Sequence, residues 1–122
     1  MGAPQVEDAP RILGYDAAGT VDAVGDAVTG FAVGDTGYYA GDITRPRSSA
    51  QLQVVDSPLA ARPPQSLDQA QAAALPLTAI TAWELLFQRM PFDADNGGEG
   101  RTLLVIAGAG GRGLVGNQVA PP

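Results

Sequence analysis

The residues with the clearest chemical potential in this chain are glycines near its C-terminal end. Residues 101–107 end in the apolar run Leu103–Ala107, with the β-branched Val105 and Ile106, and lead directly into Gly108, Gly110, Gly111 and Gly113. The spacing is G-x-G-x-x-G, in which the first glycine allows a tight turn and the second lets a pyrophosphate approach the backbone. The third lets a helix pack closely against the strand. Taken alone, the spacing fits a ligand-free turn equally well, but the strand-like run before it favours a nucleotide-binding origin.

Other reactive side chains are scarce. The chain contains no cysteine and no histidine, which excludes disulfides, thiol nucleophiles, a histidine general base and a Cys/His zinc site. Its acidic residues lack the spacing of a calcium-binding loop. We therefore predict no bound metal, and no side chain can be named as catalytic. A hydride-transfer enzyme does not require one, because the cofactor supplies the chemistry.

Charge and hydropathy limit the kinds of partner. The net charge is −6, and all seven basic residues are arginines scattered along the chain. Phosphate backbones and anionic membranes are held by clustered basic residues, so we expect neither nucleic acid nor membrane as a partner. No apolar run approaches the ~20 residues of a membrane span, and the N-terminus lacks a secretion signal. These features predict a cytoplasmic protein.

The first half of the chain shows the pattern of short strands separated by turns. Gln51–Val55 alternates apolar and polar residues most clearly, and Gly25, Gly30 and Gly34 mark turns. The expected strands or extended pieces are Ala17–Val24, Thr36–Ala40, Gln51–Val55 and Leu59–Arg62.

The second half has a helical pattern until the final strand. Ser66 is a candidate N-cap for a helix over residues 67–74. Leu77–Met90 is the strongest predicted helix, with an apolar stripe that is expected in the core. The stripe consists of Ile80, Trp83, Leu86 and Phe87. A buried strand is expected at Leu103–Ala107, and a helix can start at Leu114. The change in pattern predicts two domains, over residues 1–63 and 64–122.

Several segments resemble the medium-chain dehydrogenase/reductase superfamily. They are Leu13–Val21, Phe31–Asp35, Ala72–Trp83 and the glycine run Gly108–Gly113, in that order. Tyr38–Pro46 is most similar to the branch of zinc-type alcohol dehydrogenase-like proteins and quinone oxidoreductases. The resemblance extends from about Pro10 to Ala120.

The resemblance implies a mixed α/β fold, with a partial GroES-like β-rich domain followed by the first helices, strand and glycine turn of a Rossmann domain. It implies a fragment of an NADPH-dependent oxidoreductase that transfers hydride to a quinone, enone or related carbonyl compound, without catalytic zinc. Whether the cofactor is NADP or NAD stays open. A non-catalytic remnant or a self-associating interaction module is the alternative.

The resemblance also suggests side chains near the cofactor and the substrate. Thr78 and Thr81 lie on the helix that faces the nicotinamide in this family, although both could simply bond to helix carbonyls. Tyr38, Tyr39 and Asp42 are candidates for a substrate cleft. Tyrosines that fill the rim of a small barrel are the competing interpretation.

Departures from the family pattern limit what we expect of this chain alone. Family members are much longer, so the chain resembles a member truncated at both ends. Arg112 replaces an apolar residue, and the acid expected about 20 residues after the turn is absent. We expect weak NADPH binding and no activity from the isolated chain. An unflanked strand at Leu103–Ala107 further predicts a homodimer through this strand, or a disordered C-terminal segment.

Overall fold

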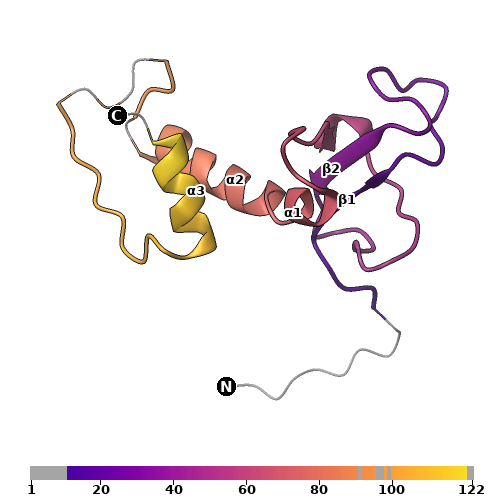
Figure 1. The fold of residues 1–122 in the computed structure, drawn as a ribbon, viewed down its shortest axis with the longest axis horizontal. Coiled ribbons are helices and arrows are strands. Elements are labelled where there is room, and N and C mark those ends of the chain that lie inside the picture. Colours follow the sequence, from indigo (N-terminus) through magenta and orange to yellow (C-terminus); the bar gives the residue numbers. More distant parts are fainter. Residues whose placement is uncertain (1–10, 91, 96–97, 99, 121–122) are drawn as a thin grey trace. The chain divides into compact units, whose positions relative to one another are not determined.

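The computed structural model describes residues 11–90, 92–95, 98 and 100–120 (Figure 1). The chain divides into two compact units, Met1–Ala73 (unit 1) and Ala74–Pro122 (unit 2). This division lies about ten residues C-terminal to the predicted boundary between residues 63 and 64. The two domains 1–63 and 64–122 stay a prediction. Residues 1–10 and 121–122 of the two predicted domains lie outside the described residues.

Unit 1 is built on a three-stranded antiparallel sheet in the order β1-β2-β3 (Figure 1). The strands are β1 (Asp16–Thr20), β2 (Thr36–Ala40) and β3 (Ala60–Ala61). This confirms the predicted strand at 36–40 and the short extended piece around Ala60. The prediction that β1 continues to Val24 is wrong. Thr20 pairs with Thr36, the first residue of β2, and the ladder therefore ends there.

The connection between β1 and β2 is fastened by Asp35. Its carboxylate accepts hydrogen bonds from the Ala32 amide at 2.9 Å and from the Arg62 guanidinium at 2.8 Å. The same guanidinium donates to the Gly30 carbonyl at 3.1 Å and lies 5.5 Å from the Phe31 ring centroid. Arg62 therefore holds the β1–β2 turn against the segment that follows β3.

The clearest strand pattern in the first half, Gln51–Val55, does not form a strand. Leu52 and Val54 are 73% and 79% exposed, whereas Gln53 and Val55 are half-buried. Both edges of β2 are already occupied by β1 and β3. An alternating pattern sets which side chains face inward, but a strand also needs a free edge for its hydrogen bonds.

One turn of 3₁₀-helix, η1 (Ser57–Leu59), precedes β3, and α1 (Gln69–Ala73) completes unit 1. The predicted N-cap Ser66 is wrong. The Asp68 carboxylate instead accepts from the Gln71 amide at 2.8 Å, and the Gln71 side chain accepts from the Asp68 amide at 3.1 Å. Two unpaired donors are satisfied reciprocally in this way. The helix packs on β1 and buries Ala72 completely.

Unit 2 contains α2 (Pro76–Trp83), η2 (Glu84–Arg89) and α3 (Gly111–Val119). Pro76 is the first residue of α2, where its missing N–H costs nothing. The predicted long helix is therefore present, but its second half, η2, is π-helical. Helices α2 and α3 lie side by side (Figure 1).

The predicted apolar stripe is only partly buried. Leu86 belongs to the core, and Phe87 is half-buried with its ring centroid 4.5 Å from that of Trp83. Trp83 and Ile80 are each about half exposed, contrary to the prediction of a core stripe. Helix α3 packs on one side of α2 and does not cover all four residues of the predicted stripe.

The predicted buried strand at Leu103–Ala107 is wrong in this structure. Residues 101–105 have no regular structure, 106–109 form a turn, and Leu104 and Ile106 are 82% and 84% exposed. A central parallel strand is held by neighbours on both edges, and no described strand flanks this segment. The mixed α/β fold class itself is confirmed. None of the described helices is long and apolar enough to span a membrane.

Candidate functional site

The glycine run forms a tight turn that leads directly into α3. The Gly110 amide donates to the Ala107 carbonyl at 2.9 Å, and the Leu114 amide donates to the Gly110 carbonyl at 2.8 Å. Ala107 adopts a positive φ of 58°, which is uncommon for a residue with a side chain. The helix starts at Gly111 rather than at the predicted Leu114.

Gly113 shows why this spacing needs a glycine at its third position. A Cβ at Gly113 would lie 2.6 Å from the Gly108 Cα atom and 2.8 Å from the Ala107 carbonyl oxygen. Both atoms belong to the backbone and cannot move aside. At Gly110 and Gly111 the nearest atoms would be 3.4 and 3.8 Å away. The first turn of α3 therefore packs directly on the preceding turn.

The start of α3 offers backbone donors to an anion. No side chain caps the helix at Gly110, and no acidic residue lies in its first turn. The first amides of a helix have no partner within it, and the helix dipole is positive at this end. Arg112 adds an exposed cation in the same turn. These residues fit the pyrophosphate of a dinucleotide, since that group binds to free amides behind a glycine turn.

Thr78 lies next to this turn, but its hydroxyl is engaged. The Cγ2 methyl of Thr78 is 3.8 Å from the position of a Cβ on Gly111. Its hydroxyl donates to the Leu75 carbonyl at 2.8 Å, and the Thr81 hydroxyl donates to the Leu77 carbonyl at 2.7 Å. Both threonine hydroxyls thus donate to helix carbonyls, which was the alternative to a role near the cofactor. Each hydroxyl can still accept a hydrogen bond.

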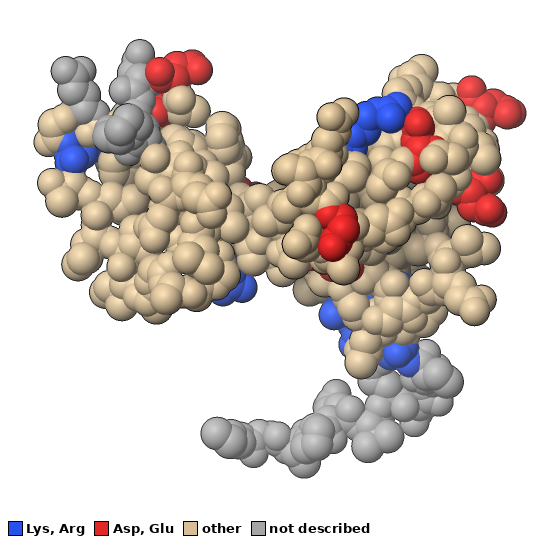
Figure 2. Space-filling model, viewed as in Figure 1, with Lys and Arg blue, Asp and Glu red and all other residues tan. Residues whose placement is uncertain are grey.

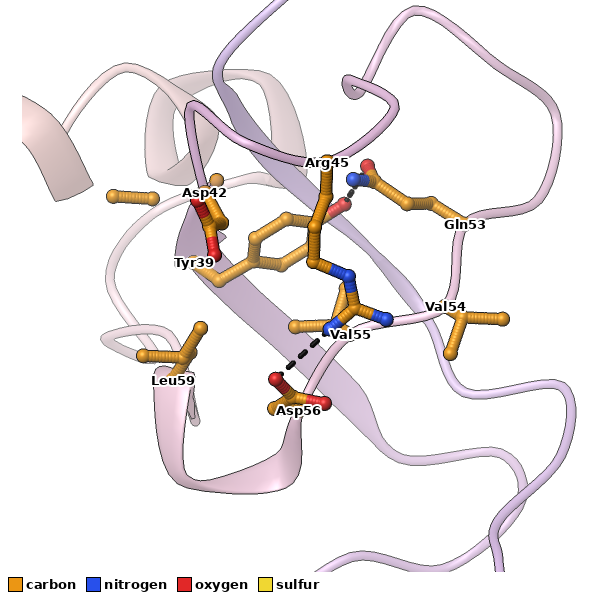
Figure 3. Close-up of a pocket in the computed structure, with 10 residues that line it drawn as sticks. Tyr39, Asp42, Arg45, Gln53, Val54, Val55, Asp56 and Leu59 are labelled. Atoms are coloured by element: carbon orange, nitrogen blue, oxygen red, sulfur yellow. Dashed lines mark hydrogen bonds and ion pairs between the residues drawn. The ribbon is translucent and has the colours of Figure 1, made fainter.

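Of the three predicted substrate-cleft residues, the structure brings two together in unit 1. Tyr39 and Asp42 line a small hollow beside β2, and Tyr38 does not (Figure 3). Tyr38 and Tyr39 are neighbours on one strand, and their side chains therefore point to opposite faces. The hollow has about 10 Å³ of room, enough for about one water molecule. In unit 1 by itself it is too small for a quinone.

Gln53 organises this hollow and was not predicted from the sequence. The Tyr39 hydroxyl donates to Gln53 Oε1 at 2.5 Å (Figure 3). Gln53 Nε2 donates to the Pro46 carbonyl at 2.9 Å. Burial raises the pKa of Tyr39, which keeps its phenol protonated as a donor. The sequence signal for Gln53 was its position in the alternating segment Gln51–Val55, and the structure shows that it is half-buried.

The charged side chains of the hollow are satisfied locally. Asp42 Oδ1 accepts from the amide and the hydroxyl of Thr44, both at 2.7 Å, and these two bonds lower the pKa of Asp42. Arg45 and Asp56 form an ion pair at 2.8 Å (Figure 3). Asp42 therefore shapes the turn at Thr44.

A larger groove of about 540 Å³ adjoins this hollow in unit 1. It is lined by β1, by the turn that follows β1 and by residues 50–55, with Phe31 and Tyr39 among its aromatic walls. No group of three or more acidic side chains in the described part of the chain could hold a metal ion. Charged side chains are dispersed over the face seen in Figure 2, most of which is uncharged.

Known proteins resemble this chain along most of its length. Residues 1–49 match the family model of the alcohol dehydrogenase GroES-like domain. A zinc-type alcohol dehydrogenase-like protein of Staphylococcus aureus is 43% identical over 119 residues, which is 95% of this chain and 35% of the relative. A 2-methylene-furan-3-one reductase of Solanum lycopersicum is 40% identical, over 91% of this chain and 29% of the relative.

A solved structure shares the fold. That of an alcohol dehydrogenase superfamily protein from Novosphingobium aromaticivorans matches with a TM-score of 0.80 at 43% identity, over 92% of this chain and 33% of that one. The chain thus spans about a third of the length of the relatives it matches. Each of these matches covers more than 90% of the chain and therefore includes residues of both units. This agreement in sequence and fold supports membership of the medium-chain dehydrogenase/reductase superfamily.

Proposed function

We propose that this chain is part of an NADPH-dependent oxidoreductase that reduces a quinone, an enone or a related carbonyl compound. The observation that carries the proposal is the uncapped N-terminus of α3 behind the close-packed turn Gly108–Gly113. Family membership supports it, as does the reductase among the relatives. When bound, the nicotinamide cofactor supplies the hydride.

The residues of the chain have binding and positioning roles in this proposal. Gly108, Gly110, Gly111 and Gly113 shape the turn, and the first amides of α3 hold the pyrophosphate. Thr78 and Thr81 accept hydrogen bonds on the nicotinamide side. Tyr38, Tyr39 and Asp42 contribute to the substrate side. These 122 residues supply no cysteine or histidine ligand for zinc.

Titration of NADPH into the purified chain tests the cofactor site. We expect binding that is weakened at least tenfold by Gly110→Asp, because a carboxylate at the N-cap occupies the free amides and repels the pyrophosphate. Gln118→Glu adds the same charge near the other end of α3 and serves as the control. No binding to the parent chain at millimolar NADPH would contradict a working site.

Self-association is a second candidate function, favoured by the exposed apolar segment before the turn. Leu104 and Ile106 project into solvent, and no charged residue lies between Thr102 and Gly111 to oppose pairing of this segment with another copy. We propose that two chains pair along residues 102–106 to form a homodimer. This arrangement would place Leu104 of each copy near that of the other.

Sedimentation equilibrium tests this pairing. The parent chain is expected to show a mass between monomer and dimer that rises with concentration, and Leu104→Lys is expected to be monomeric. Ile43→Lys introduces the same charge at another exposed apolar residue and should behave as the parent does. A monomeric parent at high concentration would rule out the homodimer.

A further inference from the structure

The segment Ala50–Asp56 separates the two hollows of unit 1. Gln53, Val54 and Val55 line both the small hollow beside β2 and the groove of about 540 Å³. Tyr39 also lines both. This segment, which we name the strap, is therefore a shared wall one chain thick.

The strap is attached by its side chains rather than by its backbone. No backbone hydrogen bond joins residues 51–55 to another segment of the described chain. Gln53 is held in the middle by the Tyr39 hydroxyl and by the Pro46 carbonyl, and Asp56 is held at one end by Arg45. The β1–β2 sheet beside it has a continuous ladder of five residue pairs.

These attachments differ in strength. The Arg45–Asp56 pair is exposed, with side-chain exposures of 39% and 64%, and such pairs contribute little. The Tyr39–Gln53 bond is short and partly buried. It joins a side chain fixed on β2 to the centre of the strap (Figure 3). Leu52 and Val54 of the strap are exposed to solvent.

We propose that Ala50–Asp56 is a movable strap, held closed over the groove of unit 1 by the Tyr39–Gln53–Pro46 hydrogen bonds. Opening breaks two side-chain hydrogen bonds and leaves the β1–β2 ladder intact. It joins the small hollow to the larger groove and exposes their shared apolar lining. Local motion of this kind is expected where few hydrogen bonds hold a segment. The strap does not depend on cofactor binding in unit 2.

Pulsed electron–electron double resonance measures the distance between two spin labels and so reports the position of the strap. The chain has no cysteine, so Val33→Cys with Val54→Cys gives one labelled site in the fastened β1–β2 turn and one on the strap. Tyr39→Phe removes the hydroxyl that donates to Gln53. We expect the open population, seen at displaced distances, to rise about fivefold, which is the effect of losing about one net hydrogen bond. Gln53→Met removes the amide that bonds to Tyr39 and Pro46, and it should also raise the open population.

Tyr38→Phe is the matched control, because the Tyr38 hydroxyl forms no hydrogen bond with any described residue. It should leave the distances unchanged. Amide exchange in β1 and β2 checks that each variant keeps its sheet, and if Tyr39→Phe loses it, Gln53→Met decides the question. Unchanged distances in the variants with an intact sheet would overturn the strap, as would an equal change in Tyr38→Phe.

Discussion

Two glycines of α3 lie in opposite environments at the scale of single residues. A Cβ on Gly113 meets backbone atoms closer than 3 Å, whereas a Cβ on Gly116 meets nothing within 4 Å. Gly113 is therefore required by packing, and Gly116 only lowers the helix propensity of α3. The single tryptophan, Trp83, lies in unit 2, and all three tyrosines lie in unit 1, which separates the optical signals of the two units.

We predict that alanine has opposite effects at these two glycines. Gly113→Ala should destabilise unit 2 by about 1–3 kcal/mol, since the turn and the helix must move apart. Gly116→Ala should stabilise it by about 0.4–1 kcal/mol, because the helix gains propensity without a clash. Denaturant unfolding followed by Trp83 fluorescence measures both. Equal effects at the two positions would contradict the close approach of Gly113 to Gly108.

Asp35 gives unit 1 a stability that depends on pH. The Ala32 amide and then the Arg62 guanidinium lower the pKa of Asp35 below the ordinary 3.8. A lowered folded-state pKa contributes stability above the unfolded-state pKa, and this contribution is lost as pH falls through the folded-state value.

The thermal midpoint of unit 1, followed by tyrosine near-ultraviolet circular dichroism, should therefore fall below about pH 4. Asp35→Asn should flatten this dependence and lower the midpoint at neutral pH. Asp26→Asn removes an exposed carboxylate that makes no hydrogen bond with a described residue, and it should keep the dependence of the parent. A parent-like acid profile for Asp35→Asn would contradict the role of Asp35.

At the scale of elements, local hydrogen bonds decide where helices begin. Ser66 precedes the helical pattern, but the reciprocal Asp68–Gln71 bonds start α1 at Gln69. Asp68 followed three residues later by Gln71 has the spacing of a capping box. The helical pattern predicted the cap at Ser66, and only the backbone course shows that Asp68 directly precedes the helix.

Alanine substitution distinguishes the two caps. Asp68→Ala should destabilise unit 1 by about 1 kcal/mol, because the Gln71 amide loses its acceptor. Ser66→Ala should change the stability of unit 1 by less than about 0.5 kcal/mol, as is usual at an exposed position. Urea unfolding followed by the tyrosine signal measures both. A larger loss with Ser66→Ala would show that the cap is at Ser66 in solution.

At the scale of the whole molecule, composition limits the cofactors that the chain can bind. Zinc in proteins is held mainly by cysteine and histidine, and the 122 residues contain neither. In the proposed reductase, this chain therefore supplies backbone donors for the cofactor and no cysteine or histidine ligand for zinc.

We accordingly predict that metal removal has no effect on this chain. Excess EDTA should leave the unfolding midpoints of both units unchanged, and zinc titrated calorimetrically should give no saturable heat. The purified protein should contain less than about 0.1 zinc per chain by elemental analysis, because no preformed site competes for the ion. Stoichiometric zinc that survives dialysis would contradict the zinc-free proposal.

The sequence by itself determined the family, the fold class, the glycine turn, the strand at 36–40 and the helices on either side of the turn. These features depend on local propensity and on motifs whose geometry follows from residue type, as at Gly113. Only the tertiary structure decided whether Gln51–Val55 and Leu103–Ala107 become strands. Their patterns are strand-like, but a strand exists only when another edge supplies its hydrogen bonds, and no described edge does so. The partners of Tyr39 and Arg62 depended on the fold for the same reason, because they lie 14 and 27 residues away in the chain.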